Sequence, residues 1–345
     1  MFPPFFQSLA HHYCLELISQ LQDGSASLIQ VTEESVQRKG QGIMLGCLVC
    51  EKDGQRVVLY AVSGISKQLK LKSNFTQEKL PRFVVEPLVL PKDINKALFK
   101  NDKKIHFLTD LINKAPENKQ TLISERTKLT DESLKSVFGL YSFTRFDKQK
   151  IALNKIILEH KGHLPPTGTG DCCAPKLLCY AFSHNFIPVS MDEVYFGNNT
   201  KNKINGESYS PCDERCGYIL PEILGLKILY RDNHIIVVNK KSGVLSVPGR
   251  GEEKKDSIAE RVKMLFPYCI EQPSVHRLDM ETSGLLILAF TEKSHKNLNE
   301  QFQNGLVHKK YVALLDGLFE DAKGINAPKK NQISGRLELK FRLNV

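Results

Sequence analysis

The stretch "SVHRLDMETSGLLILAF", residues 274–290, combines a charged turn with an apolar strand. Asp279 follows Arg277 by two residues, and the short polar run 280–283 leads directly into the apolar segment. Burying a carboxylate costs free energy unless the charge is paired. Asp279 therefore has two interpretations: it caps the turn, or the strand holds the acid still so that it can act on a bound molecule.

The sequence around this stretch predicts strands mixed with short helices. Residues 226–249 contain two strands separated by a turn at Asp232 and Asn233. Residues 256–266 are typical of a helix with Asp256 as its N-cap, and Thr291 caps a second helix that runs through Phe302 and ends at Gly305. Residues 308–317 form a further strand. This order predicts an α+β fold with a mixed, largely antiparallel sheet.

Residues 1–225 are predicted to form a mixed α/β N-terminal extension, and residues 226–345 a second domain. A β-hairpin is predicted at residues 43–63, around the Asp53-Gly54 turn. Helices are predicted at residues 130–141 and 148–160. A third helix, at residues 174–184, follows a proline- and glycine-rich loop and takes Asp171 as its cap.

Composition is that of a soluble globular protein, with 41% hydrophobic and 25% charged residues and no apolar run long enough to span a membrane. The N-terminus lacks the basic start and cleavage site of a signal peptide, so a cytoplasmic location is expected. The sequence leaves the oligomeric state open, with a monomer favoured. The net charge is +10. Residues 226–345 hold 20 Lys+Arg against 14 Asp+Glu, a net +6 that is compatible with a polyanionic partner.

The nine cysteines, an odd number in a chain without a secretory signal, favour free thiols over a disulfide framework. Cys47 and Cys50 form a C-x-x-C within a predicted strand and are interpreted as packing residues. Metal binding by four further cysteines stays open: Cys172, Cys173, Cys212 and Cys216. Adjacent cysteines are awkward ligands for one ion, and the simpler interpretation is two small buried residues and two free thiols.

Three kinds of active site fit the Asp279 segment poorly. A protein kinase loop requires H-R-D with an asparagine further on, whereas Leu278 stands between Arg277 and Asp279 here. A glycosidase requires two carboxylates across the scissile bond, and Glu281 would lie on the same side at short range. A metal site requires further ligands at fixed spacing, and none is placed around Asp279.

One family matches the segment closely. "HRLDMETSGLL", residues 276–286, resembles the H-R-L-D-x-x-T-S-G-L-L motif of the RluA-type RNA pseudouridine synthases. "ILYRDNHIIVVNKKSGVLSVPGR" before it and "KKYVALLDG" after it are similar to the flanking segments of that family, so the resemblance covers about residues 226–318. Residues 164–225, with "APKLL" and the C-x-x-x-C pair, look like the N-terminal extension of its longer members, whose role the sequence does not indicate.

The resemblance implies isomerisation of uridine to pseudouridine in structured ribosomal or transfer RNA, without cofactor or metal. It places Asp279 as the catalytic carboxylate, Arg277 as the side chain that fills the stack after the uridine is flipped out, and Tyr311 as the residue that packs on the uracil. Thr282 and Ser283 are candidates for keeping the acid ionised. Phosphate contacts are expected from nearby basic residues: Arg250, Lys254, Lys255, Lys309 and Lys310.

The family pattern normally continues with a segment of the type G-R-T-H-Q-L-R, whose arginine pairs with the catalytic aspartate. No such segment occurs up to Val345, so the resemblance predicts a catalytic domain that is shortened at its C-terminal end, with an incomplete sheet of the pseudouridine synthase type. The alternative function is therefore an inactive remnant that only binds RNA.

Overall fold

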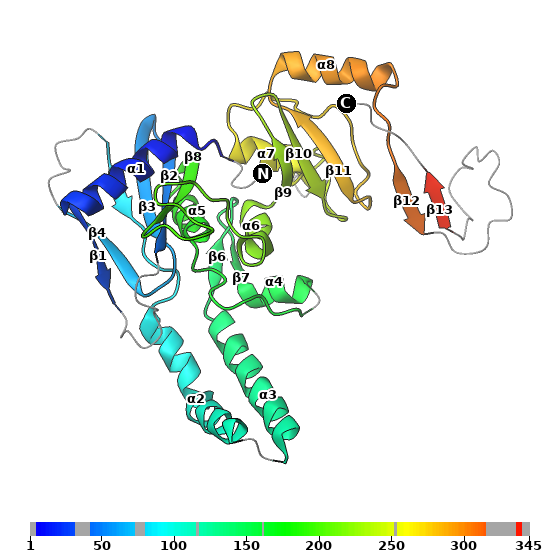
Figure 1. Cartoon of the computed structure of the whole chain (residues 1–345). Coiled ribbons are helices and arrows are strands. Elements are labelled where there is room, and N and C mark those ends of the chain that lie inside the picture. The colour runs from blue at the N-terminus through cyan, green and yellow to red at the C-terminus, as the bar shows by residue number, and fades with distance from the viewer. Residues whose placement is uncertain are drawn as a thin grey trace.

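The computed structural model describes residues 5–31, 42–72, 80–114, 117–160, 162–251, 254–314 and 336–339. Figure 1 shows the elements along the chain. The helices are α1 (Ser8–Asp23), α2 (Pro91–Asn113), α3 (Lys119–Phe138), α4 (Leu153–Glu159), α5 (Cys173–Ser183), α6 (Cys216–Leu224), α7 (Ile258–Leu265) and α8 (Glu292–Gln303). The strands are β1 (Ala26–Gln30), β2 (Ile43–Lys52), β3 (Gln55–Val62), β4 (Lys67–Leu71), β5 (Arg82–Val84), β6 (Ser142–Thr144), β7 (Lys150–Ala152), β8 (Ile187–Phe196), β9 (Lys227–Arg231), β10 (Ile235–Lys240), β11 (Gly284–Ala289), β12 (Tyr311–Leu314) and β13 (Arg336–Leu339).

The α+β prediction is confirmed. Among the described strands every pairing is antiparallel except that of β3 with β5, which is parallel. The sheets have the strand orders β5-β3-β2-β8, β11-β10-β9, β1-β4, β6-β7 and β12-β13. None of the helices in the described part of the chain combines the length and the hydrophobicity needed to cross a membrane.

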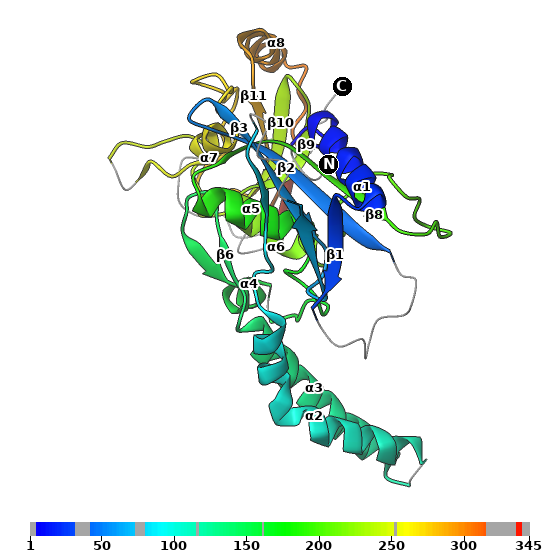
Figure 2. The same ribbon diagram turned by 90° about the vertical axis from the view of Figure 1, so that its left-hand side faces the viewer.

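The four-stranded sheet is built on the predicted hairpin, in which β2 and β3 pair through the turn at Asp53 and Gly54. Both turn residues have positive φ, 50° and 75°, as a tight hairpin of this sequence requires. Helix α1 covers one face of this sheet and α5 covers the other (Figure 2). The C-x-x-C cysteines follow this division, because fully buried Cys47 and Cys50 belong to the core clusters on opposite faces. They cannot meet at one metal ion.

Helix α5 lies unusually close to β2. A Cβ atom added at Gly46 would stand only 2.4 Å from Cys173 Cβ, so glycine permits this approach. The prediction that Asp171 caps this helix is wrong. Cys172 is the N-cap residue, Glu193 Oε1 accepts the hydrogen bond from Ala174 N–H at 2.7 Å, and Asp171 instead accepts one from Tyr141 at 2.6 Å.

Helices α2 and α3 form an antiparallel hairpin that projects from the body of the molecule (Figures 1 and 2). The predicted helix at 130–141 is the second half of α3, and Thr130 lies in its interior, where its hydroxyl donates to Arg126 O. The predicted helix at 148–160 is wrong in its first part. Lys148 has φ 64° in a turn, β7 follows, and the helix begins only at Leu153.

The predicted strands on either side of Asp232 are confirmed as β9 and β10, which pair with each other, and β10 also pairs with β11. Helix α7 packs on one face of this sheet. Its N-cap is Ser257, whose hydroxyl accepts from Glu260 N–H, and not the predicted Asp256, which pairs with Arg261 at 2.7 Å. The Thr291 cap of α8 is confirmed, with Ser294 completing a capping box. The predicted strand at 308–317 begins only at Tyr311, since residues 308–310 are not part of a strand, and residues 315–317 lie outside the described part of the chain.

The core is continuous across residue 225, from the four-stranded sheet through α5 and α6 to the β9–β10–β11 sheet. Arg231, only 3% exposed, strengthens this connection. Its guanidinium lies 3.8 Å from the ring centroid of Phe6 and 5.0 Å from that of Phe266, and it donates to the Tyr268 hydroxyl. A buried cation stacked on aromatic rings thus joins the N-terminal segment to β9.

Candidate active site

Asp279 stands on a turn whose backbone is fixed on both sides. Its carbonyl accepts from Thr282 N–H at 3.0 Å, and buried Leu278 exchanges two hydrogen bonds with the Ser246 hydroxyl, at 2.9 and 2.6 Å. The Asp279 side chain is exposed, and within the described part of the chain its carboxylate makes no hydrogen bond or ion pair. The turn therefore holds the position of the residue and leaves its acid group available to solvent or a ligand.

The side chain of Lys240 is fully buried beneath this turn, a feature that the sequence did not indicate. Its ammonium group donates to three carbonyl oxygens: Val244 O at 2.6 Å, Met280 O at 2.9 Å and Lys241 O at 3.1 Å. Burial lowers the pKa of Lys240, while the carboxylates of Glu281 and Asp279 act in the opposite direction. Lys240 thus fixes the turn and supplies positive charge close to Asp279.

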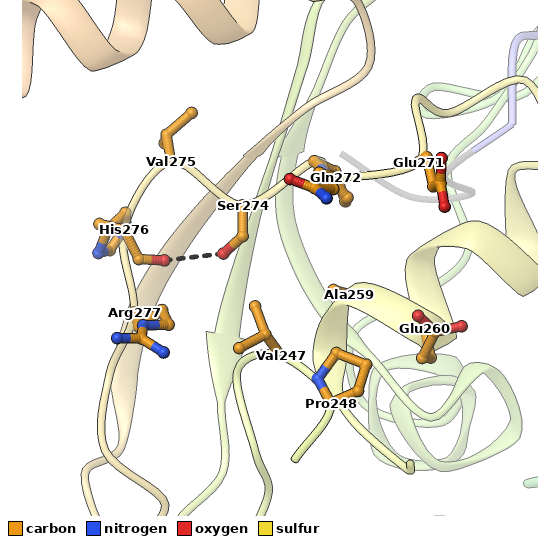
Figure 3. Close-up of a pocket in the computed structure, with 11 residues that line it drawn as sticks. Val247, Pro248, Ala259, Glu260, Glu271, Gln272, Ser274, Val275, His276 and Arg277 are labelled. Carbon is orange, nitrogen blue, oxygen red and sulfur yellow. Dashed lines mark hydrogen bonds between the residues drawn. The ribbon is translucent and has the colours of Figure 1, made fainter. Parts of the chain in front are cut away.

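Arg277 lies on the other side of the turn, in a pocket of about 390 Å³ (Figure 3). The opposite wall contains Val247 and Pro248, and the loop that carries Arg277 is closed by a hydrogen bond from Ser274 Oγ to His276 O at 2.9 Å. Arg277 is exposed, and no ion pair of its guanidinium is found among the described residues. The arginine is therefore not held by an internal salt bridge there.

A larger groove of about 720 Å³ adjoins the turn on the face of the sheet opposite α7. Its floor is formed by Val237, Leu285 and Ile287, and α8 contributes Phe302. The predicted residues Thr282, Ser283 and Tyr311 also line it, with Tyr311 half-buried at the start of β12. The structure thus places Tyr311 in a groove whose wall is the turn of Asp279, while Arg277 faces the neighbouring pocket.

His276 separates the two hollows and lines both. Its Nε2 accepts a hydrogen bond from Ile287 N–H at 3.1 Å, and its ring stacks on Phe302 with 4.9 Å between centroids. Burial, with a smaller contribution from the charge of Lys309, lowers the pKa of His276 to about 4. The imidazole is neutral near pH 7 and ties the motif to β11, which is a positioning role.

The basic residues form two groups around these hollows. Lys309 and Lys310 line the groove, and the Lys309 ammonium lies 4.8 Å from the Phe302 ring centroid. Arg250, Lys254 and Lys255 are exposed on the loop that follows Pro248, which the hydrogen bond from Gly249 N–H to Lys254 O closes at 2.8 Å. Positive side chains therefore border both sides of the Asp279 turn.

Ser208, His11 and Asp192 form a separate polar cluster without the geometry of a hydrolase triad. Ser208 Oγ and Asp192 Oδ2 both contact the same ring nitrogen, His11 Nδ1, at 3.0 and 2.8 Å. A triad requires the serine and the acid on different nitrogens. Since Asp192 is fully buried, this cluster satisfies its charge and joins α1 to β8.

Comparison with known proteins identifies the segment around Asp279. Residues 234–342 match the family described as RNA pseudouridylate synthase. The dual-specificity RNA pseudouridine synthase RluA of Escherichia coli (strain K12) is 44% identical over 119 residues, which are 34% of this chain and 49% of the relative. The protein of the same name from Yersinia pestis is 46% identical over 98 residues, 28% of this chain and 46% of the relative. The chain thus spans about half the length of these curated relatives.

Two solved human structures were also matched. RNA Pseudouridylate Synthase Domain Containing 1 has a TM-score of 0.23 and 28% identity, over 28% of this chain and 35% of the other. Domain Containing 4 has a TM-score of 0.23 and 30% identity, over 28% and 38%. Over about a third of its length, this chain is thus similar to RNA pseudouridine synthases of the RluA type.

Proposed function

We propose that this protein isomerises uridine to pseudouridine in structured RNA, with Asp279 as the reacting carboxylate. The observation that carries the proposal is the placement of Asp279: an exposed acid on a turn that is fixed on both sides, inside the family motif. Asp279 itself lines neither hollow, but Arg277 before it lines the pocket, and Thr282 and Ser283 after it line the groove. Ribosomal and transfer RNA are both proposed substrates, since structured RNA is recognised mainly by shape and exposed loops.

The reaction that this site would perform is a rearrangement without net change of atoms. The bond between C1′ of the ribose and N1 of uracil breaks, the base turns, and a bond forms between C1′ and C5. The proton on C5 is lost and N1 gains one. Asp279 would act as nucleophile or base toward the ribose, and the buried ammonium group of Lys240 holds the turn that carries it.

Access to the uridine would require the base to leave its stack. Arg277 is proposed to fill the vacated place, and its exposure without an internal ion pair in the described part of the chain supports this role. Tyr311 is proposed to pack on the uracil from the groove that it lines. The cations at the rim would contact phosphates and position the RNA without reading its sequence.

Release of tritium from RNA that contains 5-tritiated uridine tests the proposal, because the C5 proton is lost in the reaction. We expect Asp279→Asn to lower the rate at least about 1,000-fold, as removal of a reacting group does. RNA affinity should stay within a few-fold. Glu281→Gln is the matched control, since Glu281 is an exposed carboxylate on the same turn and should remain close to wild type.

Turnover by Asp279→Asn would refute the assignment of the acid. RNA binding by the wild-type chain without tritium release would support the RNA-binding alternative instead. Loss of activity in Asp279→Asn and Glu281→Gln alike would indicate that the charge of the turn matters and not the position of one carboxylate.

A further inference from the structure

Three thiols from two distant segments meet at the N-terminal ends of α5 and α6. The Sγ atoms of Cys172, Cys212 and Cys216 all lie within 4.8 Å of one another. Cys172 is the N-cap residue of α5, and Cys216 is the first residue of α6. Cys173, by contrast, points away: its thiol donates to Met44 O and Ala61 O on the four-stranded sheet. Only three of the four cysteines that the sequence left open therefore share one place.

The segment from Cys212 to Cys216 is folded so that both thiols face the same point. Cys212 O accepts from the N–H groups of Cys216 and Gly217, each at 3.1 Å, and this turn leads directly into α6. The backbone amides of Arg215 and Cys216 lie close to the Cys212 sulfur. Amide groups around a sulfur are the kind of outer-shell contact that orients thiolate ligands at metal centres.

Charged groups of both signs surround the three thiols, and buried Glu193 interacts electrostatically with Cys212 and Cys216. Three thiolates and a divalent ion carry a net charge of −1, and Arg215 interacts electrostatically with Cys212. Buried Lys176, whose ammonium donates to Val62 O at 2.8 Å, interacts with Cys172. The site therefore combines soft ligands with nearby cations, which suits a thiophilic divalent ion such as zinc.

The three sulfur atoms would need to move only slightly closer together to bind such an ion. Tetrahedral zinc with Zn–S bonds of about 2.3 Å places its sulfurs about 3.8 Å apart. Cys216 is buried and fixed, whereas Cys212 is exposed and can adjust. The exposed side of Cys212 also leaves room for a fourth ligand. We propose that Cys172, Cys212 and Cys216 bind one zinc ion, with a solvent water as the fourth ligand.

A bound zinc ion would link two helices that are far apart in the sequence. It would join the start of α5, which packs on the four-stranded sheet, to the start of α6, which continues into β9. The loop between β8 and α6 would be closed at the same point. Zinc binding should therefore stabilise the folded chain, since an ion that binds only the native state adds its binding free energy to folding.

Cobalt titration of the full chain, purified metal-free under reducing conditions, tests the site. Thiolate ligation gives sulfur-to-cobalt charge-transfer bands in the near ultraviolet, and zinc should abolish them at one equivalent per chain. Cys212→Ser is the decisive variant, because the exposed side chain can change without disturbing the core, and it should weaken metal binding at least about 10-fold. Cys172→Ser should do the same. Cys269→Ser, a half-exposed cysteine of the β11 region, is the matched control and should bind as wild type.

Thermal unfolding provides a second readout. Added zinc should raise the melting temperature of the wild type and of Cys269→Ser, but not that of Cys212→Ser. The inference would be overturned if the wild-type chain showed no charge-transfer bands, or if Cys212→Ser and Cys172→Ser bound metal as wild type does. A disulfide between two of the three cysteines under reducing conditions would also overturn it, as would iron and acid-labile sulfide at these thiols.

Discussion

The β5-β3-β2-β8 sheet and the β11-β10-β9 sheet differ in how many of their faces are buried. Strands β2 and β3 are buried at nearly every position, because α1 covers one face and α5 the other. In β10 buried and half-buried residues alternate, and Leu285 on β11 is 55% exposed. The first sheet thus stabilises the molecule, while the second leaves one face for the groove beside Asp279.

The largest expected effect is a difference in unfolding free energy between substitutions in the two sheets. Leu48 is fully buried between β3 and β8, so Leu48→Ala should cost about 3–4 kcal/mol of unfolding free energy. Leu285→Ala on the open face should cost less than about 0.5 kcal/mol. Urea unfolding of both variants measures this, and similar losses would mean that the groove face is covered in solution.

The next largest effect on unfolding free energy is expected at Arg231, which connects the N-terminal segment to β9. Arg231→Ala should destabilise the chain by about 2–3 kcal/mol, since it removes the cation that stacks on Phe6 and Phe266. A double-mutant cycle with Phe6→Ala should show a coupling of about 1 kcal/mol. Additive losses would show that the N-terminal segment and β9 are stabilised independently.

The sequence predicted the elements whose local signals are strong. The Asp53-Gly54 turn, the apolar run that became β10 and the Thr291 cap each depend on residues that are close in the chain. Helix α2 was missed because its segment is polar and lysine-rich, although its buried residues Ile94, Leu108 and Ile112 lie at helical spacing. The cap of α7 was misplaced by one residue, since Asp256 and Ser257 are both good caps and the salt bridge with Arg261 decides between them.

The candidate site was predictable only where a motif carried it. Asp279, Arg277 and Tyr311 came from the resemblance, and their roles stay predictions. The burial of Lys240 depends on carbonyls from two separate loops, which no local pattern reveals. The meeting of Cys172 with Cys212 and Cys216 likewise depends on the packing of α5 beside α6.

The dependence of unfolding free energy on pH tests the burial of His276 in the wall of the groove. The pKa of His276 is lowered to about 4, so between pH 6.5 and 4 the unfolded chain binds a proton that the folded chain does not. This pKa difference corresponds to roughly 3 kcal/mol, and solvent around the half-buried ring reduces the expected loss of stability to roughly 2 kcal/mol as the pH drops through this window. His276→Gln, which keeps an acceptor for Ile287 N–H, should lose this part of the decline, whereas His234→Gln at an exposed position should retain it. An identical decline in all three proteins would contradict the burial of His276.

The smallest expected effect concerns the rim of the groove. If Lys309 contacts a phosphate, Lys309→Ala should weaken RNA binding a few-fold and reduce the slope of log K against log salt by about 0.7–0.9, the value for one released counterion. Its stability should change little, because Lys309 touches the protein mainly through the Phe302 ring. Lys241→Ala is the matched control: Lys241 is also exposed, but it is paired with Glu159 and Glu222 and should leave the slope unchanged. Filter binding at four salt concentrations measures both variants. Equal slopes for Lys309→Ala and wild type would place the RNA away from this groove and would leave the open face of the β11-β10-β9 sheet without its proposed ligand.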